Sequence, residues 1–96
     1  MTRLYHPDFL EEMLYLSNQF ESENANPFVV ALEETIADAC LFPEAAPKTQ
    51  IDGIRKKTVG KYEFHLIYEA RADTILFYAI AHKRRHPFYW IHRLDS

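Results

Sequence analysis

The sequence predicts an α+β fold in a single domain, 1–96, in which an N-terminal antiparallel helical hairpin packs on a small antiparallel β-sheet and a short helix ends the chain. Apolar residues recur at helical spacing in the N-terminal half. From Ile54 onward they change to short runs rich in β-branched and aromatic residues. The connections between these runs are too short for parallel crossovers, which favours an antiparallel meander.

The first helix is expected to begin at Pro7, because proline suits the first helical turn. The preceding run Thr2–Tyr5 is a candidate strand. One apolar stripe then follows at steps of three and four residues, through Phe9, Met13, Leu16 and Phe20. We expect Glu11 and Glu12 to lie outside this stripe.

A second helix is expected after the polar stretch "SENAN", residues 22–26. Asn26 suits a helix N-cap, and Pro27 suits the first turn that follows it. The helix should end before Pro43, where a loop begins. Two helices joined by so short a loop must run antiparallel.

Three antiparallel strands are expected after this loop, at Ile54–Val59, Tyr62–Glu69 and Thr74–His82. The third is almost wholly apolar, so we expect it at the centre of the sheet with both faces covered. The terminal helix is expected over Pro87–Leu94.

The charge divides the chain into an acidic and a basic half. The net charge is −3, but residues 1–50 carry two basic and nine acidic side chains, whereas residues 51–96 carry nine basic and five acidic ones. The basic half is the candidate anion-binding face. The alternative is that two solvated faces merely differ in sign.

Several classes of site are excluded by composition. A single cysteine, Cys40, permits no intramolecular disulfide and no cysteine-based zinc site. Gly53 and Gly60 are isolated, so no glycine-rich phosphate loop is present. We expect no metal and no cofactor. No apolar run approaches the roughly 20 residues that span a bilayer, and nothing resembles a signal peptide, so a cytoplasmic protein without a membrane partner is expected.

The stretch "AIAHKRRHPFYW", Ala79–Trp90, leads from an apolar strand directly into cations and aromatic rings. Its basic residues are Lys83, Arg84, Arg85 and His86, and a second basic group lies on the first strand of the meander, Arg55, Lys56 and Lys57. Guanidinium and ammonium groups suit phosphate oxygens. Whether the two groups meet depends on the register of the sheet, which the sequence leaves open.

Aromatic and histidine residues extend this candidate site. Tyr89 and Trp90 can stack on exposed bases, and His65, His82 and His86 can move protons near neutral pH. The competing interpretation is that Phe88 and Trp90 pack the last helix on the sheet. By strand alternation His65 lies on a polar face and is expected to be exposed, and Arg93 is expected to be a solvated residue at a helix end.

The segment "KYEFHLIYEARADTILFYAIAHKRRHPFYW", residues 61–90, resembles the core of the RelE/ParE superfamily of toxins from bacterial type II toxin–antitoxin systems. The apolar strand closing in Ala-x-Ala-His, the basic pair, the proline and the aromatic pair carry the resemblance. The upstream helical hairpin, the "FPEAAP" loop (residues 42–47) and Arg55 also fit.

This resemblance implies a growth-inhibiting toxin that is neutralised by a cognate antitoxin in a hetero-oligomer. The form of the C-terminal segment favours a ParE-like plasmid stabilisation protein, which would inhibit DNA gyrase without being an enzyme. Target or antitoxin contacts are then expected from the basic residues and the indole, namely Arg55, Lys57, Lys83, Arg84, Arg85, His86 and Trp90.

The alternative within the superfamily is a RelE-like ribosome-dependent mRNA endoribonuclease, or mRNA interferase. The resemblance then implies catalytic roles for Arg84, Tyr89 and Lys56, with His65 or His82 as a proton-transfer group. Two departures oppose this reading, because His65 stands where such enzymes carry arginine and Thr58 where they carry a second lysine. A binding module without toxicity is a third possibility.

Overall fold

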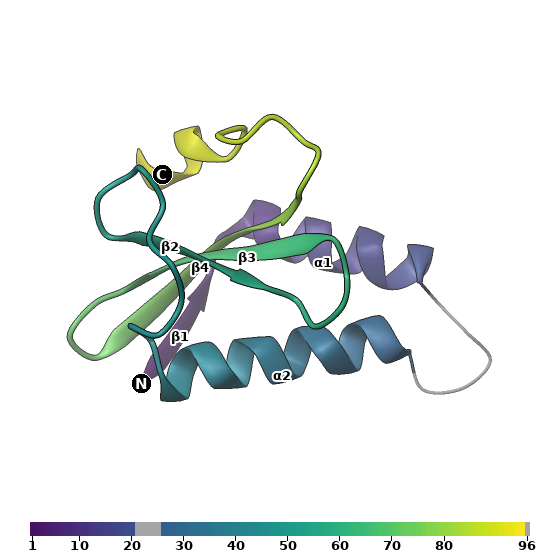
Figure 1. The fold of residues 1–96 in the computed structure, drawn as a ribbon, viewed down its shortest axis with the longest axis horizontal. Coiled ribbons are helices and arrows are strands. Elements are labelled where there is room, and N and C mark those ends of the chain that lie inside the picture. Colours follow the sequence, from purple (N-terminus) through teal and green to yellow (C-terminus); the bar gives the residue numbers. More distant parts are fainter. Residues whose placement is uncertain (21–25, 96) are drawn as a thin grey trace.

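The sheet lies between two helices on one face and the C-terminal segment on the other (Figure 1). The computed structural model describes residues 1–20 and 26–95. The elements are β1 (Thr2–Tyr5), α1 (Pro7–Gln19), α2 (Pro27–Leu41), β2 (Ile54–Thr58), β3 (Phe64–Ala70), β4 (Thr74–His82) and the 3₁₀ helix η1 (Ile91–Asp95). The predicted α+β class, with a helical hairpin on a small sheet, is confirmed.

The strand order is β1-β4-β3-β2, so β4 is an inner strand, as expected. β2, β3 and β4 form the predicted antiparallel meander. β1 pairs in parallel with β4, with Thr2 opposite Thr74 and Tyr5 opposite Phe77, so the sheet is mixed and the expectation of a wholly antiparallel sheet was wrong. A parallel pair needs a long crossover, and the helices together with β2 and β3 supply one.

Both helices begin with a side-chain cap followed by proline. Asn26 accepts hydrogen bonds from the backbone N–H groups of Phe28 (3.1 Å) and Val29 (3.4 Å), which confirms it as the N-cap of α2. At α1 the cap is His6, whose Nδ1 accepts from the N–H of Asp8 at 3.1 Å. The predicted break over 22–26 lies, apart from Asn26, outside the described residues.

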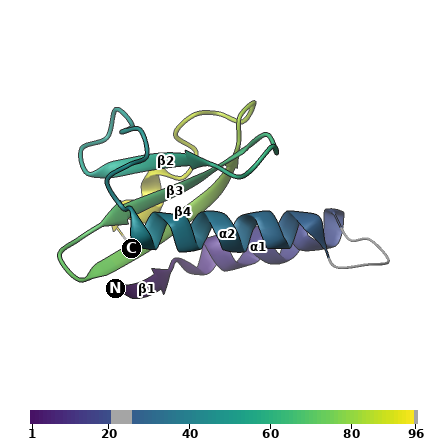
Figure 2. The same cartoon turned by 60° about the horizontal axis from the view of Figure 1, so that its bottom comes forward.

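The helices cover one face of the sheet and share one core with it (Figure 2). Its fully buried aromatic rings include Phe9 from α1, Phe28 from α2 and Phe77 from β4. The turn between β2 and β3 touches α2 at Gly60, where φ is +52° and an added Cβ would lie 3.3 Å from that of Ala31. Glycine is needed there because both the backbone angle and the close approach disfavour a side chain.

A bulge in β4 determines which residues face the C-terminal segment. The pairing with β3 shifts between Ile67, opposite Ala79, and Tyr68, opposite Phe77, so Tyr78 is the extra residue. Tyr78 and Ala79 consequently both belong to the second core, on the face opposite the helices. Trp90 is 1% exposed and packs in this core, as the packing interpretation of the sequence predicted.

The C-terminal segment is less helical than expected. Residues 87–90 form turns, and only Ile91–Asp95 forms a short 3₁₀ helix. Phe88, Tyr89 and Trp90 are consecutive and all pack against the second core. Successive residues of an α-helix point about 100° apart, so an α-helix would direct one of them away from the sheet.

Neither α1 nor α2 has the length and apolar character that a bilayer span requires, and the rest of the described chain offers no longer helix. Within the same residues, no three His, Cys, Asp or Glu side chains gather closely enough to share a metal ion.

Trp90 should be the anchor of the C-terminal segment. Replacement by alanine removes a fully buried indole and should lower the free energy of unfolding by about 3–5 kcal/mol, because the cavity that remains cannot close completely. Urea denaturation measures the change. The matched control is Ile91→Ala, at a neighbouring side chain that is 45% exposed, which should cost no more than about 0.5 kcal/mol. Similar losses in both variants would contradict an anchoring role for the indole.

Candidate functional site

The candidate site is a pocket of about 450 Å³ beside Trp90, which we call the cationic pocket. Its walls come from loop residues 48–50, β2, β3, the end of β4, and residues 83, 85–88 and 90. Its lysine and arginine lining residues are Lys48, Lys56, Lys83 and Arg85. Three imidazoles join them, those of His65, His82 and His86. Segments distant in the sequence thus place seven basic side chains around one hollow.

Only some members of the two basic groups of the sequence, residues 55–57 and 83–86, lie together in the structure. Lys56 lines the cationic pocket together with Lys83 and Arg85. Arg55 and Lys57 flank Lys56 on β2 and therefore point to the other face of the sheet. The Arg55 Nη1 donates to the backbone carbonyls of Glu44 (3.0 Å) and Ala46 (2.7 Å). Arg55 thus holds the 43–52 loop against β2.

His65 is half-buried, not exposed as the strand alternation predicted, because the C-terminal segment covers its face of the sheet. Its Nδ1 is buried and has no hydrogen-bond partner in the described part of the chain. Burial lowers the pKa of the imidazole, and the charges of Lys56 and Lys83 lower it further. His65 is therefore a neutral group among cations at neutral pH.

The other two histidines of the pocket hold the backbone of the turn after β4. The Nδ1 of His82 accepts from the N–H of Arg84 at 3.0 Å, and the Nδ1 of His86 accepts from the N–H of Phe88 at 3.4 Å. An accepting Nδ1 leaves the proton of a neutral imidazole on Nε2. Both rings therefore stabilise the turn after β4, and each can offer its Nε2–H as a hydrogen-bond donor.

The arginine pair after β4 is divided between two environments. Arg84 is exposed and is not among the residues that line the cationic pocket. Arg85 lines the pocket and also stacks on Tyr89, with its guanidinium carbon 3.6 Å from the ring centroid. Its Nη1 lies 3.8 Å from a carboxylate oxygen of Glu12. Arg85 thus links the pocket to a second polar cluster.

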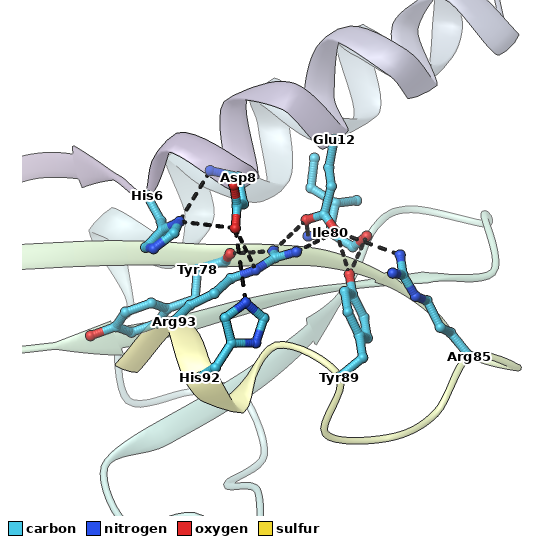
Figure 3. Close-up of polar contacts among 9 residues, drawn as sticks. All are labelled: His6, Asp8, Glu12, Tyr78, Ile80, Arg85, Tyr89, His92 and Arg93. Carbon is cyan, nitrogen blue, oxygen red and sulfur yellow. Dashed lines mark hydrogen bonds and ion pairs between the residues drawn. The ribbon is translucent and has the colours of Figure 1, made fainter. Parts of the chain in front are cut away.

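This second cluster, which is centred on Glu12 and Arg93, takes the place of a neighbouring strand along one edge of β4 (Figure 3). β1 ends at Tyr5, so β4 lacks its neighbour beyond Phe77. The Glu12 carboxylate accepts from the backbone N–H of Ile80 at 3.1 Å, and Arg93 Nη1 donates to the carbonyl of Tyr78 at 2.8 Å. Side chains from α1 and η1 therefore satisfy the edge of β4 that no strand covers.

Glu12 also binds the C-terminal segment directly. Its carboxylate accepts from both terminal nitrogens of Arg93 (2.8 and 3.1 Å) and from the Tyr89 hydroxyl at 2.6 Å (Figure 3). Burial and the bond to Glu12 raise the pKa of Tyr89. Arg93 is 6% exposed, so the expectation of a solvated residue was wrong, because the chain end turns back onto α1. Glu12 likewise lies inside the packed face of α1, three residues after Phe9.

The predicted catalytic set is thus only partly brought together. Lys56, His65 and His82 line the cationic pocket, whereas Arg84 and Tyr89 are outside its lining. Trp90 borders the pocket but packs in the core, and its 1% exposure leaves no ring face for a base.

Comparison with solved structures finds a chain of the chromosomal ParDE TA system from P. aeruginosa. The two chains superpose with a TM-score of 0.59 at 10% sequence identity, covering 85% of this chain and 95% of the other. At this identity the likeness is one of fold, and it agrees with the fold that the RelE/ParE resemblance implied. No family model matches the sequence, and no curated protein matches it.

The Glu12–Arg93 pair should be the main polar support of the fold. Glu12→Ala removes the carboxylate that bonds both terminal nitrogens of buried Arg93, leaving Asp8 at 3.6 Å from its Nε, and should cost about 3–5 kcal/mol in urea denaturation. Glu11→Ala, at the exposed neighbour on α1, is the matched control and should change stability by no more than about 0.5 kcal/mol. A loss in Glu12→Ala no greater than in the control would refute this role.

His65 should titrate below the usual pKa of 6.5. As the pH falls below 6.5, the unfolded chain binds a proton before folded His65 does, so acidification down to the lowered pKa should reduce stability. NMR titration of the imidazole measures the midpoint, and His65→Gln should remove this part of the acid dependence. A midpoint at or above 6.5 would show that burial and the two lysines do not act as described.

Proposed function

We propose that the chain is the toxin of a type II toxin–antitoxin module, a ParE-like protein that stops growth by binding an essential target. The fold likeness to a chain of the chromosomal ParDE TA system, over 85% of this chain, carries the proposal. The resemblance of residues 61–90 to the superfamily supports it independently of the fold. DNA gyrase is the favoured target, by the form of the C-terminal segment.

The turn after β4 is the proposed target-binding surface. Lys83, Arg84, Arg85 and His86 are consecutive and exposed at the surface. Arg84 is the residue best placed to reach a target, because Arg85 also contacts Glu12 and Tyr89. Cations in such a position favour an acidic or nucleic-acid-bearing partner and speed its association.

A cognate antitoxin is the proposed second partner, in a cytoplasmic hetero-oligomer. Three large apolar side chains of α1 are exposed, those of Leu10 (43%), Leu14 (65%) and Tyr15 (63%). Neighbouring apolar side chains exposed on one helix favour burial against another protein. They support a surface on α1 that a partner chain would cover, and Tyr15 in this surface borders a hollow that Arg85 also lines.

A second candidate function is RNA cleavage, and the cationic pocket supports it. Neutral His65 can accept a proton from a 2′-hydroxyl, while Lys56, Lys83 and Arg85 can stabilise the charge that develops on the phosphate. This assignment differs from the one that the resemblance implied. Arg84 and Tyr89 lie outside the lining, so the pocket groups would perform the chemistry instead.

Inducible expression in a bacterial host without antitoxin tests the function. We expect growth arrest with relaxed or broken DNA and intact transcripts. Arg84→Ala should abolish the arrest, because it removes an exposed cation that neither lines the cationic pocket nor stacks on Tyr89. Lys61→Ala removes an equal charge at an exposed position elsewhere and should leave the arrest unchanged.

The outcomes separate the candidates. Cleavage of translated mRNA that depends on Lys56 and His65 would replace the gyrase reading with the ribonuclease reading. Normal growth at a confirmed level of folded protein would contradict both. If the Arg84→Ala variant still arrested growth fully, Arg84 would not be part of the target-binding surface.

A further inference from the structure

We propose that the cationic pocket binds the terminal phosphate of a nucleotide, either a free nucleoside monophosphate or the phosphorylated end of an oligonucleotide, and that His65 takes up a proton from solvent as it binds. This inference goes beyond the toxin proposal. It does not depend on it, because binding is a property of the purified chain whether or not the chain stops growth.

The charge of the pocket suits a terminal phosphate. Lys48, Lys56, Lys83 and Arg85 supply four basic side chains, and no carboxylate is among the described residues that line the pocket. A phosphate monoester carries about −1.5 to −2 at pH 7, whereas an internal phosphodiester carries about −1. The monoester therefore gains more from this excess of cations. Guanidinium and ammonium groups are also the usual ligands of its oxygens.

The size and the apolar wall suit one nucleotide. The pocket volume of about 450 Å³ lies in the lower part of the range of roughly 300–1,000 Å³ that small-molecule sites occupy. Ile67, Ala81 and Phe88 line it beside the cations. The Phe88 ring is held edge-on against Trp90, with centroids 5.9 Å apart. It offers a fixed, half-buried aromatic surface for a base.

The imidazole arrangement points to His65 as the proton acceptor. Protonation of His65 would break no hydrogen bond at its buried Nδ1, whereas His82 and His86 use Nδ1 to accept backbone N–H groups and would lose those bonds on protonation. The charged groups near it are Lys56 on β2, Lys83 and Arg85 after β4, and Lys48 on the loop, with the exposed Glu63 two residues before it.

Phosphate binding offsets part of the positive charge around His65. In the free protein burial, together with Lys56 and Lys83, keeps the ring neutral, and a bound dianion would favour the protonated form. The ring should therefore have a higher pKa in the complex than in the free protein. Binding should become tighter as the pH falls from 8 to 6.5, and this window lies above the second pKa of about 6 for the phosphate itself.

Calorimetric titration of the purified chain with AMP, adenosine and inorganic phosphate tests the site. AMP should bind, and adenosine should bind at least tenfold more weakly. Lys56→Ala and Lys83→Ala should each weaken AMP binding by about tenfold, since each removes a charged phosphate contact. Lys61→Ala removes the same charge outside the pocket and should have little effect. Equal binding of AMP and adenosine, or equal losses in all three variants, would overturn the proposal.

Repeating the titration in buffers of different ionisation enthalpy counts the protons taken up. The wild-type chain should take up protons between pH 7 and 8, and His65→Asn should lose most of this uptake. Uptake that persists in His65→Asn would overturn the assignment to His65. Circular dichroism and a urea midpoint establish that each variant is folded before it is titrated.

Short DNA oligonucleotides distinguish the two sources of the phosphate, and they lack the 2′-hydroxyl that cleavage needs. Tighter binding of a 5′-phosphorylated trinucleotide than of AMP would identify a nucleic-acid end, and the reverse order would identify a free nucleotide. Equal binding of the 5′-phosphorylated and 5′-hydroxyl forms would assign the pocket to internal phosphodiesters and overturn the proposal.

Discussion

The pairing of Glu12 with Arg93 is the interaction on which the rest of the structure depends. It joins α1, near the start of the chain, to η1, at its end, by two hydrogen bonds of 2.8 and 3.1 Å. The same groups complete the edge of β4 where β1 stops. Because the C-terminal segment is tied down there, Trp90 is buried and Phe88 becomes a wall of the cationic pocket.

The basic residues of the C-terminal half therefore divide into those that hold the fold together and those that are available to bind a ligand or partner. The net charge does not reveal this division. Arg55 and Arg93 bond backbone carbonyls, and Arg93 also bonds a carboxylate, so both are structural. Lys56 and Lys83 face the pocket, and Arg84 is exposed at the turn. The pleat of β2 and the turn after β4 decide this division. It explains why a chain whose positive and negative charges nearly balance can form the cationic pocket.

The elements were predictable to the extent that local pattern determines them. The helical stripes, the Asn26 cap and the meander follow from spacing and turn residues that lie close together in the sequence. The parallel pairing of β1 was missed because it joins segments some seventy residues apart. Glu12 and Arg93 were misplaced for the same reason, although one sign was present: Glu12 is three residues after Phe9 and one before Met13, within the apolar stripe. For the candidate site, the residue types could be predicted from the sequence. Only the register of the sheet showed that Lys56, and not Arg55 or Lys57, reaches the pocket.

The bulge at Tyr78 determines how the pocket would respond to a change in chain length. Because the extra residue reverses the alternation of β4, Ala81 borders the pocket and Ile80 packs with the helices. A one-residue deletion at the bulge would restore the regular alternation of β4, so Ile80 and Ala81 would stay on their present faces. The bulge is thus a place where an evolving chain can lose one residue, and with it one side chain of the second core, without moving the pocket lining to the other face of the sheet.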